Sequence, residues 1–106
     1  MNKSSTLHFS LNQNINYQEE SVVSKEVFRN KAGTVTLFAV AQGQGLSKHK
    51  TPYDALIYII DGEADITIAG IVNKVKAGEM IHMSAGSLHA LKATKQFKML
   101  LIMMKG

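Results

Sequence analysis

Two histidines, each following a glycine-marked turn, are the residues of this sequence best suited to chemistry. Of the four histidines, His49 lies in the segment GQGLSKHKTPYDALIYIIDG and His89 in the segment GEMIHMSAGSLHALKA. In each segment a glycine opens a turn and the histidine follows at the start of a predicted strand. Imidazole is a common ligand of transition metals, and it also forms hydrogen bonds with organic ligands. We therefore expect a metal site or a ligand pocket where the two histidines meet.

Two other residues could supply a third ligand to the same site. Asp54 directly precedes a predicted strand, and a β-bulge or a late strand start after Pro52 would turn its carboxylate toward the histidines. His82 lies on a short predicted strand at residues 80–83, and its facing is open. The alternative is that both side chains are ordinary polar groups on the outer face. His8, in the polar N-terminal region, is expected to be solvated.

The segments around the two histidines resemble the two conserved motifs of the cupin family, over residues 43–93. The landmarks that stand in register with those motifs are Gly43, His49, Gly62, Gly78, Gly86 and His89. The stretch DGEADITIAGIVNKVKAGE between the motifs is similar to the hairpin that joins them in this family. The resemblance implies a small single-domain barrel of the conserved-barrel type (cupin 2), commonly dimeric, with its pocket inside the barrel.

Four positions depart from the cupin motifs, and two of them are metal-ligand positions. Family sites typically combine two histidines and a glutamate from the first motif with one histidine from the second. Here Thr51 occupies the second histidine position and Ala55 the glutamate position, while Ser84 and Ala93 replace the usual proline and asparagine. Zinc and similar ions normally take three or four protein ligands, so two imidazoles alone would hold a divalent metal weakly.

The residues that must position these side chains alternate between apolar and polar types, which predicts an all-β fold. The predicted strands cover residues 34–41, 55–60, 64–69, 71–76, 80–83 and 97–104. Ala69-Gly70 is predicted to form a hairpin turn, and Asp61-Gly62 a break between strands. The candidate helix covers residues 17–29, where three β-branched valines weaken the helical interpretation.

Short strands separated by regular turn signals predict an antiparallel β-barrel, a double-stranded β-helix of the jelly-roll type. The chain has 106 residues, 45% of them hydrophobic, which suits a single domain over residues 1–106. We expect residues 31–106 to form the barrel core and residues 1–30 to pack on the barrel or on a dimer partner. The chain contains no cysteine, which excludes disulfides and thiolate metal sites.

The predicted strands at residues 55–60 and 97–104 are apolar on both faces. A barrel strand that is open to water needs only one apolar face, so the outer faces of these two strands need a cover. A second sheet, the N-terminal segment or another subunit could provide it. For a chain this short we predict a homodimer.

The charge pattern argues against nucleic-acid and membrane partners. The formal net charge is +4, but the lysines are scattered along the chain and Arg29 is the single arginine. Nucleic-acid sites usually combine clustered basic residues with aromatic side chains. The apolar run at residues 55–60, which no other run exceeds, is far shorter than the roughly 20 residues that cross a bilayer. Residues 1–10 lack the apolar core of a secretory signal, so a cytoplasmic protein is the simplest expectation.

Three functional hypotheses follow. The first is a protein that binds a small organic ligand and holds a divalent ion such as zinc, nickel, manganese, iron or copper only weakly. Its pocket would be lined by His49, His89, Thr51, Ala55, Ile57 and Ile59. The second is a metal-dependent cupin enzyme of the dioxygenase or isomerase type, and the third is a structural or regulatory dimer without a ligand. The following methionines are expected to fill the core or an interface, or to line an apolar pocket: Met80, Met83, Met99, Met103 and Met104.

Overall fold

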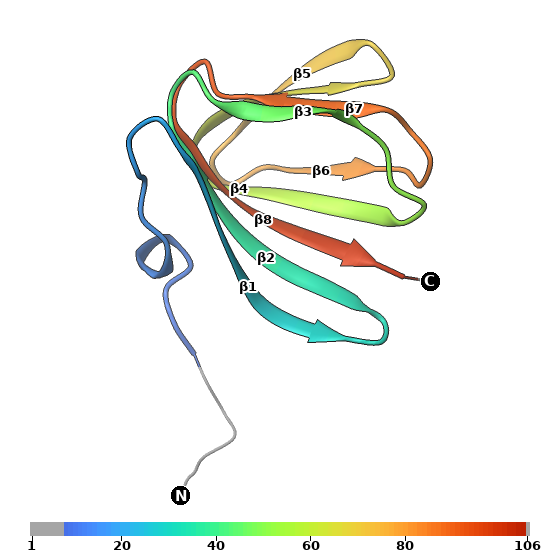
Figure 1. The fold of residues 1–106 in the computed structure, drawn as a ribbon, viewed down its shortest axis with the longest axis horizontal. Coiled ribbons are helices and arrows are strands. Elements are labelled where there is room, and N and C mark those ends of the chain that lie inside the picture. The colour runs from blue at the N-terminus through green and yellow to red at the C-terminus, as the bar shows by residue number, and fades with distance from the viewer. Residues whose placement is uncertain (1–7, 106) are drawn as a thin grey trace, which may run out of the picture.

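The computed structural model describes residues 8–105 as a curled antiparallel sheet with a short N-terminal segment along its outside (Figure 1). A 3₁₀ turn, η1, covers Asn12–Asn14. The strands are β1 (Val22–Asn30), β2 (Gly33–Val40), β3 (Gly45–His49), β4 (Asp54–Ile68), β5 (Ile71–Lys76), β6 (Met80–Met83), β7 (His89–Lys92) and β8 (Phe97–Met104). The all-β prediction is confirmed. Within residues 8–105, no helix is long and apolar enough to cross a membrane. Residues 1–7 and Gly106 of the expected domain lie outside this range.

The sheet folds over on itself because one long strand belongs to both of its halves. β4 pairs with β8 and β6 along its first half and with β5 and β7 along its second half. The strands follow the order β1-β2-β8-β4-β7-β3, and these pairs are antiparallel. In Figure 1 the strands β1, β2, β8 and β6 form one layer, and β3, β5 and β7 form the other. The inside of this half-barrel lies between the two layers.

β4 crosses from one layer to the other at a bulge near Gly62. The register of β4 against β8 shifts between Ile59 and Asp61, and Gly62 adopts a φ of +77°, a conformation that favours glycine. A Cβ atom at this position would lie 2.2 Å from the carbonyl oxygen of Gln96, so a side chain does not fit without moving the backbone. The predicted break at Asp61-Gly62 is therefore wrong, because the bulge bends the strand without ending it.

The inner faces of both layers form the main hydrophobic core. Before the bulge the odd-numbered residues of β4 point inward, and after it the even-numbered residues do, because one extra residue reverses the alternation. The fully buried side chains of this core include Ile57, Ile59, Ile66, Phe97 and Met99. Burying a side chain of this size stabilises the fold by roughly 1.5–3 kcal/mol.

The N-terminal segment packs against the outer face of the layer that contains β2 and β8. Ile15 contacts Leu37 and Ala39 there in a second, smaller core. Lys98 is also buried on this face, and its Nζ donates to the backbone oxygen of Asn12 at 2.7 Å and to the side-chain Oδ1 at 2.8 Å. These two bonds replace the water that the ammonium group loses on burial. They also anchor the segment to β8.

Three strands differ from the sequence-based prediction. β1 occupies most of the candidate helix at residues 17–29, so the helix is wrong: the valines pair with β2, as their β-branched shape favours. β3 and β7 are short strands outside the ranges that the periodicity indicated, although a strand was expected to begin at each histidine. The predicted hairpin is confirmed. β4 and β5 pair as far as Ile68 and Ile71, and both turn residues, Ala69 and Gly70, have positive φ as in a type I′ turn.

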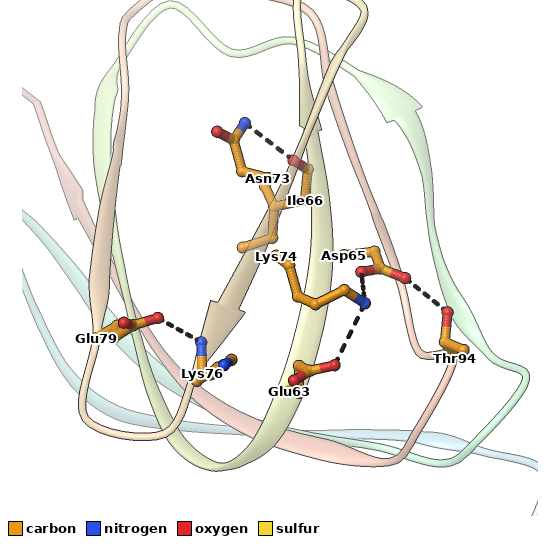
Figure 2. A network of polar contacts seen from close by, with 8 residues as sticks. All are labelled: Glu63, Asp65, Ile66, Asn73, Lys74, Lys76, Glu79 and Thr94. Carbon is orange, nitrogen blue, oxygen red and sulfur yellow. Dashed lines mark hydrogen bonds and ion pairs between the residues drawn. The ribbon is translucent and has the colours of Figure 1, made fainter.

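A polar network on β4 and β5 ties this hairpin to the loop between β7 and β8 (Figure 2). Lys74 Nζ lies 3.0 Å from Asp65 Oδ1 and 3.3 Å from Glu63 Oε2. Thr94, in the loop, donates its hydroxyl proton to Asp65 Oδ2 at 2.6 Å. The hydrogen bond from Thr94, and then the one from Lys74, holds the pKa of Asp65 below its usual range.

Candidate functional site

A small, mostly apolar cavity lies between the two layers. The volume open to the centre of a water-sized sphere is about 30 Å³, which is room for one or two water molecules. The cavity is lined by Leu46, His49, Thr51, Ala55, Ile57, Met83, His89, Leu91, Met99, Leu101 and Met103. A larger hollow of about 360 Å³ beside β3 and β7 includes neither histidine, and one of about 180 Å³ beside the β4–β5 turn includes His89 but not His49. Both histidines line the inner cavity, so the chemistry predicted for the pair belongs there.

β3 and β7 bring the two predicted histidines together on the wall of this cavity. His49 is the last residue of β3 and His89 the first residue of β7, and the two are paired across the strands. Their Nε2 atoms lie 3.1 Å apart, and their ring centroids lie 4.3 Å apart with the ring planes at 70°. His89 is buried and His49 is exposed. The expectation that each histidine begins a strand holds for His89 only.

Backbone carbonyls fix the proton on the far nitrogen of each ring. Nδ1 of His49 lies 2.7 Å from the carbonyl oxygen of Ser47, and Nδ1 of His89 lies 3.1 Å from the carbonyl oxygen of Ser87. A carbonyl oxygen only accepts hydrogen bonds, so each Nδ1 carries a proton and donates it. A neutral ring with its proton on Nδ1 has an unprotonated Nε2. The two ring nitrogens that meet are therefore both electron-pair donors.

Burial opposes protonation of His89. Removal from water lowers the pKa of His89, and the neighbouring His49 lowers it further, while the carbonyl of Ser87 acts weakly in the opposite direction. In the neutral pair, two electron pairs meet at 3.1 Å with no hydrogen between them. The arrangement suits a positively charged group that both nitrogens can share.

Asp54 and His82 lie away from the histidine pair. Their neighbours Ala55 and Met83 line the cavity, so the alternation of each strand turns Asp54 and His82 to the outer face. There His82 Nε2 lies 3.2 Å from Asp54 Oδ1, which also accepts the Ala85 N–H at 3.0 Å. The Ala85 N–H, and then His82, lowers the pKa of the Asp54 carboxyl. The third-ligand hypothesis is wrong: within residues 8–105 no three His, Cys, Asp or Glu side chains are placed to hold a metal.

Three of the four other predicted pocket residues line the cavity, namely Thr51, Ala55 and Ile57. Ile59 does not. It adjoins the bulge of β4, one strand period beyond Ile57, and its side chain is enclosed by the core. The alternation of β4 placed Ile59 on the correct face, but the extent of the cavity along that face depends on where the strand bends.

Methionine side chains form one wall of the cavity, which we call the methionine wall. From the sequence, these methionines were expected either to fill the core or an interface or to line an apolar pocket. Met83 of β6 and Met99 and Met103 of β8 line the cavity, whereas Met80 is exposed. The strand register places Met83 and Met103 directly opposite Ala55, one on each side of β4. Alternation alone puts Met99 and Met103 on one face of β8, but only the pairing with β4 identifies that face as the inner one.

Comparisons with known proteins agree with this architecture. A family model described as a cupin domain matches residues 36–104. A conserved protein of unknown function from Streptococcus pyogenes is 31% identical, with a TM-score of 0.89 over 98% of this chain and 90% of that chain. A cupin 2 conserved barrel domain protein from Leptotrichia buccalis is 38% identical, with a TM-score of 0.89 over 92% of this chain and 47% of that chain. A cupin superfamily protein from Desulfitobacterium hafniense is 26% identical, with a TM-score of 0.88 over 98% of this chain and 95% of that chain. No curated protein matches the chain.

The residues present do not fit the divalent-metal site that the sequence resemblance implies. Thr51 and Ala55 stand on the cavity wall at two of the expected ligand positions, and the alanine side chain has no donor atom. No carboxylate from residues 8–105 lines the cavity. The donors that remain are two imidazole nitrogens, the Thr51 hydroxyl and the thioethers of the methionine wall. This set is softer than the usual one, which includes a carboxylate.

Proposed function

Since the chain belongs to the cupin domain family, we propose that it is a binding protein whose inner cavity holds a single cation between His49 and His89. The observation that carries the proposal is the distance of 3.1 Å between the two Nε2 atoms. The contacts of both Nδ1 atoms with backbone carbonyls assign the proton of each neutral ring to Nδ1, which leaves Nε2 as an electron-pair donor. A cation placed between them converts the repulsion of two electron pairs into two attractive contacts.

The surroundings of the histidine pair favour a metal ion over a proton. Burial lowers the pKa of His89, which disfavours the protonated form of that ring. The hydrogen bonds from Nδ1 to the carbonyls of Ser47 and Ser87 are the kind of outer contact that orients metal-binding histidines. They hold both Nε2 atoms in position before any ion arrives.

The size of the cavity argues against the hypothesis of an organic ligand. Pockets for organic ligands typically measure about 300–1,000 Å³, whereas this cavity offers about 30 Å³. A single ion with one water molecule fits that space, and an organic molecule does not. The enzyme hypothesis lacks support for a different reason. General acid–base chemistry would have to use the two histidines that we assign to the cation, because the rest of the described wall is apolar except for Thr51.

The test is thermal unfolding of protein stripped of metal, with zinc, nickel, divalent copper and, under anaerobic conditions, monovalent copper added separately. An ion present at 100 times its Kd stabilises the folded state by about 2.7 kcal/mol, which raises the melting temperature by roughly 10 °C or more for a chain of this size. We expect this rise for at least one ion in the wild type and in a His82→Gln control. The double variant His49→Gln/His89→Gln should show none. Equal rises in the double variant, or no rise for any ion in the wild type, would overturn the proposal.

We propose in addition that two copies of the chain associate through the outer face of the layer formed by β1, β2, β8, β4 and β6. By direct cross-strand pairing, one apolar row on this face contains Phe28, Val35, Ile102 and Leu56. Phe28 is 58% exposed, and Met80 at the edge of the same layer is 53% exposed. A contiguous apolar face of this kind supports an interface between two identical surfaces. We call Phe28, Val35, Ile102 and Leu56 the outer row.

A further inference from the structure

We propose that the cation is monovalent copper, held by Nε2 of His49, Nε2 of His89 and a methionine thioether from the cavity wall. This inference rests on the cation site proposed above and names its occupant. Copper would bind in its reduced state and remain in it, so no electron is transferred. The ligand set replaces the histidine and glutamate that this chain lacks at residues 51 and 55.

The distance between the histidine nitrogens calls for a third ligand. A nitrogen ligand lies about 2.0 Å from its metal, and two such nitrogens that are 3.1 Å apart enclose an angle of roughly 100° at the ion. A two-coordinate, linear arrangement would need the nitrogens roughly 4 Å apart at the same bond length. The bent arrangement therefore leaves coordination positions open, and they can be filled without moving either ring.

The methionine wall lies next to Ala55, the position at which this chain lacks the glutamate ligand of the family motif. Ala55 occupies the glutamate position of the resemblance, and its short side chain leaves space on the inner face of β4. Met83 and Met103 are its direct partners on β6 and β8, so long thioether side chains flank that space from both sides. Three of the six methionines of the chain line this one cavity, the third being Met99. Thioether sulfur is thus the donor most abundant on the wall.

The chemistry of these donors selects monovalent copper. Thioether sulfur and imidazole nitrogen are soft or intermediate ligands, which favour copper in the reduced state over calcium, magnesium or manganese. No carboxylate of residues 8–105 lines the cavity to compensate a second positive charge. A singly charged ion costs less to bury among apolar side chains than a doubly charged one.

The site has one ligand exposed to solvent, and its other proposed ligands are buried or partly buried. His49 is exposed, so its nitrogen can meet an ion that arrives from solvent. His89, Met83 and Met99 are buried behind it. An ion that passes His49 is therefore surrounded by apolar side chains, which keep out water and favour the reduced state of copper.

The test is an anaerobic titration of untagged, metal-free protein with monovalent copper, in competition with a coloured chelator specific for that ion. We expect one copper ion per chain. The triple variant Met83→Leu/Met99→Leu/Met103→Leu keeps the approximate volume of the core, and its copper affinity should fall at least tenfold. The double variant Met80→Leu/Met104→Leu changes exposed methionines and serves as the matched control, with unchanged affinity.

X-ray absorption on the copper-loaded wild type gives a second readout that needs no variant. We expect two nitrogen neighbours and one sulfur neighbour at about 2.3 Å, a usual metal–sulfur distance. Absence of sulfur from that spectrum, or equal affinity in the triple variant and the wild type, would overturn the thioether assignment. If zinc or nickel binds through both histidines but monovalent copper does not, this inference fails while the proposed cation site stands. If no ion binds through the histidines, both fail.

Discussion

At the scale of single residues, the direction of two hydrogen bonds decides what the histidine pair can do. The carbonyls of Ser47 and Ser87 each take the proton of an Nδ1 atom, which leaves both Nε2 atoms as electron-pair donors. With the other tautomer on one ring, the two histidines would form a simple N–H···N hydrogen bond. Such a pair would need no cation, so the chemistry of the site depends on the backbone that surrounds it.

Gly62 is the residue at which we expect a single methyl group to cost most. Gly62→Ala places a side chain at a φ of +77° and a Cβ atom 2.2 Å from the carbonyl oxygen of Gln96. Gly70→Ala is the matched control, because Gly70 has a φ of +84° but nothing within 4 Å of its Cβ position. The left-handed backbone alone costs roughly 1–2 kcal/mol. Urea unfolding should show that loss for Gly70→Ala and at least twice the loss for Gly62→Ala, and equal losses would contradict this account of the bend.

At the scale of elements, β4 organises the molecule because its two halves pair with four different strands. Its second half depends on polar contacts as well as on the core. Asp65 contacts both Lys74 of β5 and Thr94 of the β7–β8 loop, and so joins three parts of the sheet (Figure 2). The strength of this connection should depend on the charge of one carboxyl group.

Stability should depend on pH through Asp65. The pKa of Asp65 is lower in the folded state than its unfolded value of about 3.9. The unfolded chain then binds the proton more readily, so the contribution is complete above about pH 5 and is lost as the pH falls through the folded pKa. We expect Asp65→Asn to lower the free energy of unfolding by about 1 kcal/mol at pH 7. The difference from the wild type should shrink below about pH 4. Glu19→Gln, on the exposed N-terminal segment, is the control and should leave the pH profile unchanged. A difference for Asp65→Asn that stays constant down to pH 2 would contradict the assignment.

The N-terminal segment should be released from the sheet by the variant Lys98→Met. The variant keeps an unbranched buried side chain but removes both hydrogen bonds to Asn12. We expect faster cleavage after Tyr17 by chymotrypsin, by about tenfold for the loss of roughly 1.4 kcal/mol in local stability. Lys95→Met, in the exposed loop before β8, should leave the cleavage rate as in the wild type. An unchanged rate for Lys98→Met would contradict this role of Lys98 and leave the apolar contacts of Ile15 and the hydrogen bond from Tyr17 to Asp61 to hold the segment.

At the scale of the whole molecule, the two faces of the layer around β8 differ in what they pack against. The inner face carries the core and the cavity, whereas the outer face is covered by the N-terminal segment only in part. The outer row is not part of the apolar cluster around the N-terminal segment, and Phe28 in particular is exposed to water. Because the proposed cation site is built entirely within one chain, dimerisation and ion binding should be separable.

We predict a dimer that dissociates when a charge enters the outer row. Light scattering at micromolar concentration should give twice the mass of one chain for the wild type. Ile102→Glu should give the mass of one chain, because an unpaired carboxylate is costly to bury in an apolar interface. Val72→Glu, on the exposed β5 strand, is the control and should remain dimeric. A wild type with the mass of one chain would contradict the interface.

Local patterns accounted for much of the fold and for less of the site. The β4–β5 hairpin could be predicted because its alternation and its two-residue turn at Ala69-Gly70 are properties of adjacent residues. β1 could not, because helical and extended backbones are both open to its sequence until β2 offers a partner. The side of the sheet on which the Asp54 and His82 side chains lie could not be predicted either, because it depends on strand register. A shift of one residue in register would have turned either side chain inward.

Residue types and their spacing along the chain were enough to predict the all-β class, the hairpin and the pair of histidines, and the resemblance to the cupin motifs identified the loss of the usual ligands at Thr51 and Ala55. The folded chain was needed to show that the two Nε2 atoms meet, that Asp54 and His82 face away, and that methionines flank Ala55. Those outcomes depend on the pairing of strands that are distant in sequence. Such pairing is set by the packing of the whole sheet and by its bend at Gly62, which no local pattern contains.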